Sequence, residues 1–87
     1  MAKYRVALAS SAGKELGKPP IHLIARMVTH IENLASNPRP SGCKKLRGGD
    51  CELRIRVGDW RVVYTIDDGK SLVEVTRIRH RSDVYKR

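Results

Sequence analysis

The first half of the chain carries hydrophobic residues at the spacing of a helix. From position 21 to 35 they recur about every 3.6 residues, at Ile21, Ile24, Val28, Ile31 and Ala35, with Met27 and Leu34 widening the stripe. Pro19-Pro20 precedes this stretch, where a missing N–H costs nothing, and Asn37-Pro38-Arg39-Pro40 ends it. We predict one amphipathic helix that covers an apolar surface.

Two shorter elements are predicted ahead of this helix. Tyr4 to Leu8 alternates enough to form a short strand. Ser10 or Ser11 can cap a short helix that runs to Leu16, and Gly17 can end it. The chain therefore begins with a strand, a short helix and the long helix.

The second half changes to the period of two that is typical of strands. Apolar residues recur at every second position over 53–57 and 60–66, and 72–78 is predicted as a third strand, with turns at Gly58-Asp59, predicted as type II′, and at 67–70. With Gly58-Asp59 as the loop, the apolar pairs on one face are Val57 with Trp60, Ile55 with Val62, and Leu53 with Tyr64. With Asp68-Gly69 as the second loop, Val73 pairs with Tyr64 and Val75 with Val62.

These patterns together predict an α+β fold in a single domain, residues 1–87. Its parts are an N-terminal strand, two helices and a three-stranded antiparallel meander. The meander has one apolar face, and we expect the helices to pack against it.

The opposite face of the meander carries arginines. The same register places Arg56 directly across from Arg61, with Arg54 two residues along the strand. Like charges directly opposite on neighbouring strands are destabilising, whereas planar guanidinium groups match phosphate oxygens well. The cluster favours a phosphate-binding face. The alternative is a solvated surface, partly compensated by Glu52 or Glu74.

The overall charge points to the same class of ligand. Eighteen Lys and Arg against nine Asp and Glu give a formal net charge of +9, which is typical of a domain that meets a polyanion such as nucleic acid. The alternative is a basic surface that only maintains solubility. Both halves of the chain are basic, so an anion site must be built into the fold.

Other function classes are disfavoured. No apolar run approaches the roughly 18–20 residues of a membrane span, and residues 1–8 lack the apolar core of a secretory signal. We therefore expect a cytoplasmic protein with no membrane partner. Cys43, Cys51 and the three histidines show no spacing typical of a zinc site, so we expect no metal and no cofactor.

Three segments give the chain a resemblance to the RelE/ParE superfamily of bacterial and archaeal toxins, and within it to the RelE branch. They are Lys45-Leu46-Arg47-Gly48, the stretch from Leu53 to Tyr64, and Arg79-His80-Arg81-Ser82-Asp83-Val84-Tyr85. The resemblance implies the toxin of a type II toxin–antitoxin pair, with a RelB-like antitoxin as its partner. RelE-type members cleave mRNA in the ribosomal A site, so it also implies a metal-independent endoribonuclease.

The reaction implied by the resemblance uses the RNA's own 2′-OH, which attacks the adjacent phosphorus and leaves a 2′,3′-cyclic phosphate and a 5′-OH. Carried over by position, the catalytic residues are Arg54, Arg56, Arg61, Arg81 and Tyr85, with Arg79 as a competing alignment for Arg81. The chemistry requires removal of the 2′ proton, stabilisation of charge on the phosphorane and protonation of the departing 5′-oxygen.

The proton acceptor is a separate question. Some family members have lysines where this chain has Arg54 and Arg56, and arginine stays protonated in proteins. The general base is therefore expected to be His80 or Tyr85, with a slight preference for His80 because an imidazole ordinarily titrates near neutral pH.

The remaining basic residues are expected to contact RNA or the ribosome; they are Lys44, Lys45 and Arg47 in the loop before the meander, and Arg79, Lys86 and Arg87 near the C-terminus. For the loop, a solvated surface is the alternative.

The competing function is that of the ParE branch, a non-enzymatic toxin that poisons DNA gyrase. The arginine face with His80 and Tyr85 favours RNA cleavage, because gyrase poisoning needs no convergent phosphate site. We expect the antitoxin to cover the basic face or the C-terminus, or to displace a mobile C-terminal segment.

Overall fold

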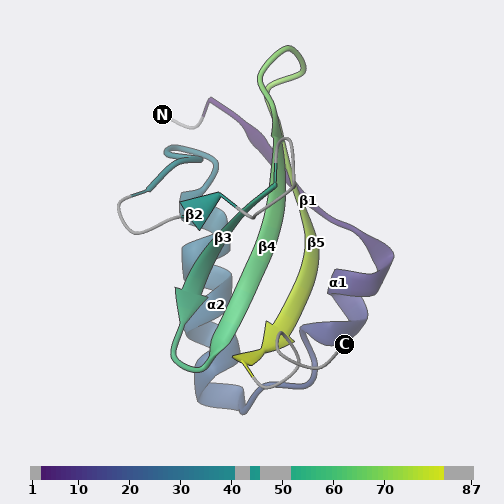
Figure 1. The fold of residues 1–87 in the computed structure, drawn as a ribbon, viewed down its shortest axis with the longest axis vertical. Helices are drawn as coiled ribbons and strands as arrows, with labels where there is room; N and C mark the ends of the chain where they lie inside the picture. Colours follow the sequence, from purple (N-terminus) through teal and green to yellow (C-terminus); the bar gives the residue numbers. More distant parts are fainter. Residues whose placement is uncertain (1–2, 41–43, 46–51, 82–87) are drawn as a thin grey trace.

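The computed structural model describes residues 3–40, 44–45 and 52–81. Its elements are β1 (Arg5–Leu8), α1 (Ser10–Glu15), α2 (Ile21–Asn33), β2 (Lys44–Lys45), β3 (Glu52–Val57), β4 (Trp60–Asp67) and β5 (Leu72–His80). The strands form a five-stranded sheet in the order β1-β5-β4-β3-β2. In Figure 1, α2 lies behind the sheet and α1 lies beside β5, and no described helix covers the face turned toward the viewer. The predicted α+β fold with helices on one face is confirmed.

The long helix forms as predicted and ends before the proline-rich segment. Pro20 occupies its N-terminal cap, and the stripe buries Met27, Ile31 and Leu34 against the sheet. Ile21, the first residue of the predicted stripe, is 86% exposed. The buried face of α2 therefore begins one turn later than the hydrophobic pattern indicates.

The hairpin of β3 and β4 has the predicted register. Val57 pairs with Trp60, Ile55 with Val62, and Leu53 with Tyr64. Gly58 has φ of +62° in the turn, and this positive angle at the first central residue is what a type II′ turn requires. Trp60 packs against the core from a partly buried position.

The sheet has two features that the sequence pattern does not predict. β1 pairs in parallel with β5, from Arg5 opposite Leu72 to Leu8 opposite Val75, so the sheet is mixed rather than purely antiparallel. The two-residue strand β2 lies in the basic loop and pairs antiparallel with β3.

The predicted register of β4 with β5 is wrong by two residues. Tyr64 lies opposite Val75 rather than Val73, because the turn contains four residues, 68–71, and Ser71 in it adopts φ of +52°. A slip of two leaves every side chain on its predicted face, since the side-chain period of a strand is two. The predicted apolar face is therefore correct although the predicted register of β4 with β5 is wrong.

A bulge then changes the register of β5 a second time. Tyr64 pairs with Val75 but Val63 pairs with Arg77, so Thr76 is the extra residue. The Thr76 hydroxyl donates a hydrogen bond of 3.3 Å to the Val63 carbonyl. Beyond the bulge, Ile78 rather than Val75 lies opposite Val62 and enters the core.

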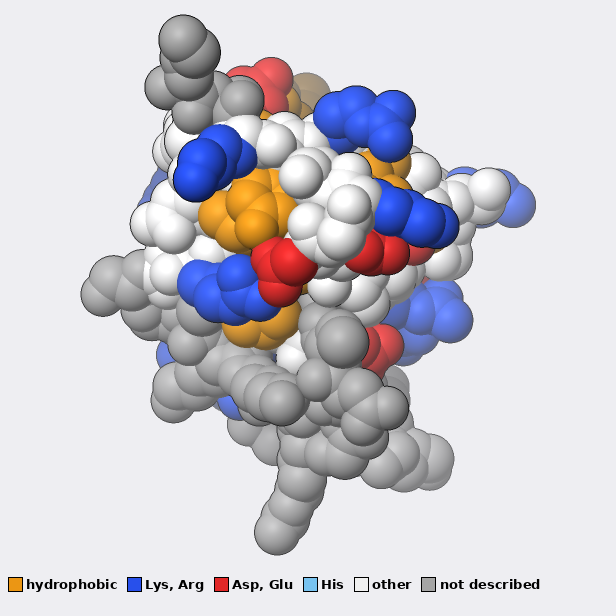
Figure 2. Space-filling view, turned by 90° about the horizontal axis from the view of Figure 1, so that it is seen from above, with side chains coloured by type: hydrophobic (Ala, Val, Ile, Leu, Met, Phe, Trp, Pro, Cys, Tyr) orange, Lys and Arg blue, Asp and Glu red, His pale blue; other side chains and the backbone are white. Residues whose placement is uncertain are grey.

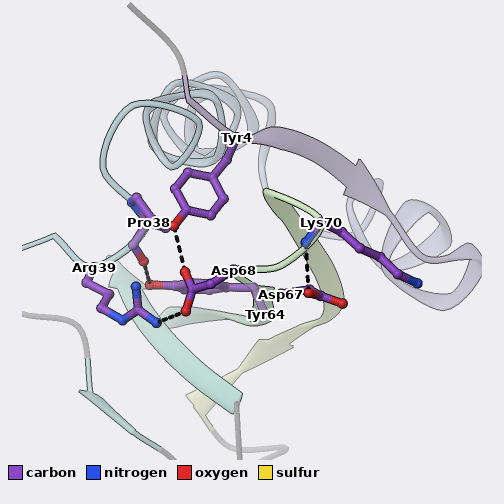
Figure 3. Close-up of polar contacts among 7 residues, drawn as sticks. All are labelled: Tyr4, Pro38, Arg39, Tyr64, Asp67, Asp68 and Lys70. Atoms are coloured by element: carbon purple, nitrogen blue, oxygen red, sulfur yellow. Dashed lines mark hydrogen bonds and ion pairs between the residues drawn. The ribbon is translucent and has the colours of Figure 1, made fainter.

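Tyr64 couples the sheet to the segment that follows α2. Its ring is fully buried, and its hydroxyl donates a hydrogen bond of 2.7 Å to the carbonyl of Pro38, which is also buried (Figure 3). We expect Tyr64→Phe to lower the free energy of unfolding by about 1–3 kcal/mol, because it leaves that carbonyl without this donor. In a domain of this size, each kcal/mol shifts Tm by roughly 4–8 °C. Urea and thermal unfolding measure both quantities.

Tyr4 supplies the matched control. Its hydroxyl also donates a hydrogen bond, of 2.6 Å to the Asp68 carboxylate, but this contact is exposed (Figure 3). Tyr4→Phe should therefore leave the unfolding midpoint almost unchanged. Equal midpoints for Tyr64→Phe and Tyr4→Phe would contradict the role assigned to the buried bond.

Candidate functional site: an arginine row across the sheet

Three arginines lie side by side across the face of the sheet opposite α2. Arg56 on β3 is the direct partner of Arg61 on β4, and Arg61 is the direct partner of Arg79 on β5. We call Arg56, Arg61 and Arg79 the arginine row. In the next register position along the strands, Arg54 and Arg77 flank Val63 on the same face.

The bulge at Thr76 is what brings β5 into this arrangement. Without it, the pairing that holds between Tyr64 and Val75 would continue and place Arg77 opposite Val62, on the core side. With the extra residue, Ile78 faces the core while Arg77 and Arg79 join the arginine face. The sequence signal for the bulge is the apolar spacing at 73, 75 and 78, where strict alternation would continue to 77.

The arginine row concentrates positive charge that is only partly compensated. Arg56 donates from Nε to the Gly58 carbonyl at 3.0 Å, and Arg79 pairs through Nε with Glu15 of α1 at 3.4 Å. The Nη1 atom of Arg61, in the centre, is buried and has no hydrogen-bond partner among the described residues. A buried guanidinium nitrogen without an acceptor is unfavourable, so this position is suited to an anion.

Acidic residues lie further along the same face. Glu52, Thr65 and Glu74 form the register row two residues from Arg54. Within the described part of the chain, neither Glu52 nor Glu74 forms an ion pair with an arginine. The compensation considered from the sequence is therefore not made by direct contact, and the face remains positive near the β3–β4 turn.

The structure does not bring His80 to the arginine row. Successive side chains of a strand point to opposite faces, so His80 lies on the face opposite to Arg79. It is the direct partner of Trp60, and the two rings pack edge to face with centroids 5.2 Å apart. His80 therefore lies on the side of the sheet that carries the core.

The other predicted site residues are placed as follows. Arg81 directly follows β5 with an exposed side chain, and its N–H donates to the Asp59 carbonyl at 2.7 Å. Lys44 is the backbone partner of Arg54, and Lys45 of Leu53. Arg47, Tyr85, Lys86 and Arg87 lie outside the described residues. Of the two candidate terminal arginines, Arg79 is the one aligned with Arg61.

A second polar cluster lies at the end of the molecule that holds the β4–β5 turn. Asp68 accepts hydrogen bonds from Tyr4 and from Arg39, the latter at 3.1 Å (Figure 3). The Tyr4 bond and then the Arg39 bond hold the pKa of Asp68 below its ordinary value, and the same carboxylate raises the pKa of Tyr4 and of Arg39. Figure 2 looks down on this end and shows acidic and basic side chains interspersed around hydrophobic atoms. These contacts join three segments of the chain: the residues before β1, the segment after α2, and the β4–β5 turn.

A cavity of about 540 Å³ lies next to the arginine row. Its lining comes from the C-terminal half of α2, the segment after it, and β3; these residues are His30, Asn33, Leu34, Asn37, Pro40, Ile55 and Arg56. Arg56 is thus shared by the cavity and the row. The mixed apolar and polar lining suits a peptide segment better than a bare anion.

Two further properties bear on the class of protein. Among residues 3–40, 44–45 and 52–81, no three His, Cys, Asp or Glu side chains are grouped to hold a metal ion. None of the described helices combines the length and the hydropathy needed to cross a membrane.

Comparison with known proteins agrees with this architecture. The family described as the ParE toxin of the type II toxin–antitoxin system parDE matches residues 9–85. Toxin RelE of Mycobacterium tuberculosis is 39% identical over 85 residues, covering 95% of this chain and 87% of that protein.

Solved structures show the same fold. A chain of the toxin–antitoxin complex RelBE2 from M. tuberculosis superposes with a TM-score of 0.79 at 30% identity, over 91% of this chain and 99% of that one. A chain of the archaeal RelE–RelB complex from Pyrococcus horikoshii OT3 gives 0.80 at 25% identity, over 91% and 96%. The chain therefore belongs to the ParE/RelE family of type II toxin–antitoxin system toxins, in its RelE branch, as the sequence resemblance implied.

Proposed function

We propose that this toxin is an endoribonuclease that cleaves mRNA, on the ribosome, by attack of a 2′-OH on the adjacent phosphorus. The observation that carries the proposal is the arginine row, whose central member has a buried Nη1 without a described partner. Three guanidinium groups on neighbouring strands form a surface that suits the oxygens of a phosphate chain. A toxin that only docks on a protein target has no need for this arrangement.

The proposed chemistry assigns a role to each group. The 2′-oxygen bonds to phosphorus, the bond from phosphorus to the 5′-oxygen breaks, a base takes the 2′ proton, and the 5′-oxygen receives a proton. Arg61 and Arg79 contact the non-bridging oxygens and stabilise the charge of the phosphorane. Arg54, Arg56 and Arg81 hold the neighbouring phosphates. Removal of the 2′ proton is assigned to Tyr85 rather than to His80, because His80 packs against Trp60 on the other face of the sheet.

The remaining basic residues bind the RNA backbone and ribosomal RNA. Lys44, Lys45 and Arg47 precede β3 in the chain, and Lys86 and Arg87 follow β5. Each neutralised phosphate releases a counterion, so binding should weaken steeply as the salt concentration rises. This basic surface supports recognition of mRNA within a ribosome, which presents many phosphates at once.

The proposal is tested with purified toxin and ribosomes that carry a short mRNA with a defined codon in the A site. We expect a cut within that codon, with a 2′,3′-cyclic phosphate on one fragment and a 5′-OH on the other. The same mRNA without ribosomes shows whether the ribosome is required. Intact mRNA in both reactions, together with gyrase trapped on cleaved DNA in a parallel assay, would replace this proposal by the ParE-type function.

We also propose that a RelB-like antitoxin neutralises the toxin by covering the arginine row and the adjacent cavity. Relatives of this fold were solved as RelBE and RelE–RelB complexes, and a chain of +9 charge favours an acidic partner segment. Amide hydrogen exchange of the complex should show protection in β3, in the C-terminal half of α2 and in the segment after β5. Protection confined to β1 and α1 would contradict this surface.

A further inference from the structure

The sheet edge beside β1 is completed by side chains of α1. β1 ends opposite Val75, so none of the described strands lies beside the edge of β5 beyond this point. The Ser11 hydroxyl donates to the Thr76 carbonyl at 2.9 Å, and Glu15 Oε1 accepts the Ile78 N–H at 2.8 Å. Two side chains of a short helix thus replace the backbone partners that another strand would supply.

Glu15 does more than complete this edge. Its second oxygen, Oε2, lies 3.4 Å from Arg79 Nε and 3.8 Å from Arg77 Nη1. The Glu15 side chain is only 14% exposed, whereas those of Arg77 and Arg79 are 49% and 40% exposed. The carboxylate is therefore anchored on the backbone of β5 by one oxygen while the other holds two arginines of the phosphate-binding face.

The ion pair with Glu15 leaves the two terminal nitrogens of the Arg79 guanidinium available. Glu15 forms an ion pair with Nε of Arg79, and no hydrogen bond or ion pair among the described residues involves the two terminal nitrogens of Arg79. A guanidinium held at Nε has its orientation restricted, yet it can still present the terminal nitrogens to an anion. Arg79 is the member of the arginine row directly opposite Arg61.

We propose that Glu15 is a positioning residue that orients Arg79 toward the phosphate beside Arg61. The inference rests on the proposed function, since it gives Arg79 a phosphate to contact. Because Glu15 acts through Arg79, its loss should slow the chemical step and should not weaken the binding of RNA. Losing a negative charge near the arginines should also make the face more positive, so RNA binding should be retained or strengthened.

The decisive variant is Glu15→Gln. A glutamine carbonyl can still accept the Ile78 N–H, but the charge that holds Arg77 and Arg79 is gone. We expect the urea midpoint to stay near that of the wild type, kcat on programmed ribosomes to fall about 10- to 100-fold, and KM to stay equal or fall. In ¹⁵N–¹H spectra, the Arg79 Nε–Hε resonance should move, because the charged carboxylate of its ion-pair partner becomes a neutral amide.

Ser11→Ala is the matched control. It removes the other side-chain contact with the same edge of β5, but Ser11 has no described contact with an arginine. Its kcat should equal that of the wild type. An equal loss of kcat in Ser11→Ala and Glu15→Gln would show that Glu15 only completes the edge, and would overturn the proposal.

A double-mutant cycle covers the case in which Glu15→Gln is unstable. With Arg79 already replaced by glutamine, Glu15→Gln should lower kcat no further, because the two residues act as a unit. Additive losses would contradict the inference. If the wild-type toxin cuts no mRNA, the proposed function fails. The Arg79 resonance, recorded with inorganic phosphate as the probe, then still decides whether Glu15 orients Arg79.

Discussion

Replacing Arg61 by methionine is expected to lower the rate of mRNA cleavage about 100- to 1,000-fold without weakening the fold. The loss corresponds to one donor that stabilises transition-state charge, about 2.7–4 kcal/mol of barrier. The fold should tolerate the change because Arg61 lies between Arg56 and Arg79, and its buried Nη1 has no described acceptor. Removing it relieves repulsion between directly opposed like charges.

Two measurements separate this expectation from a general loss of structure. Single-turnover cleavage on programmed ribosomes gives the rate, and urea unfolding gives the stability of the same preparation. Sulfate should raise the unfolding midpoint of the wild type more than that of Arg61→Met, because a bound anion stabilises the folded state. Arg26→Met, which removes an exposed arginine on α2, is the matched control and should cleave normally. Wild-type cleavage by Arg61→Met would refute the role of the arginine row.

Tyr85→Phe is expected to lower the cleavage rate on the order of 10²–10⁴-fold, the usual contribution of general acid–base catalysis. His80→Gln should change it only a few-fold. The sequence slightly favours His80, but in the structure His80 packs against Trp60 on the face opposite to Arg79. A proton acceptor at the phosphate has to share the face of the arginine row. Tyr85 is therefore our proposed general base.

The pH dependence of the single-turnover rate distinguishes the two residues. A tyrosine ordinarily titrates near pH 10, so with Tyr85 as the base the rate should keep rising with pH above neutrality. Tyr85→Phe should flatten this rise. A rise that disappears in His80→Gln but persists in Tyr85→Phe would assign the base to His80 instead. Urea midpoints verify that both variants are folded.

The sequence by itself determines the parts of this protein that depend on local periodicity. The alternation of Leu53, Ile55 and Val57 with arginines, followed by a Gly-Asp turn, fixes the β3–β4 register and places Arg54, Arg56 and Arg61 on one face. A two-residue loop permits one pairing, and the apolar face excludes a slip by one. The apolar stripe of α2 and the family resemblance of these segments also depend only on residues that are close together in the sequence.

Only the tertiary structure decides how distant segments complete the site. Arg79 reaches Arg61 because of the bulge at Thr76, and Glu15, 64 residues earlier in the chain than Arg79, meets it because α1 continues the edge that β1 leaves open. The Glu15 contact has no periodic signature, since it depends on where one sheet edge ends and another element begins, and the bulge appears in the sequence only as a change of apolar spacing after Val75. The bulge also decides the face of His80, because it sets the face of Arg79 and His80 is one step further along β5. Sequence pattern therefore identifies which residues are basic and which strand carries them, whereas packing at the sheet edge decides which of them converge.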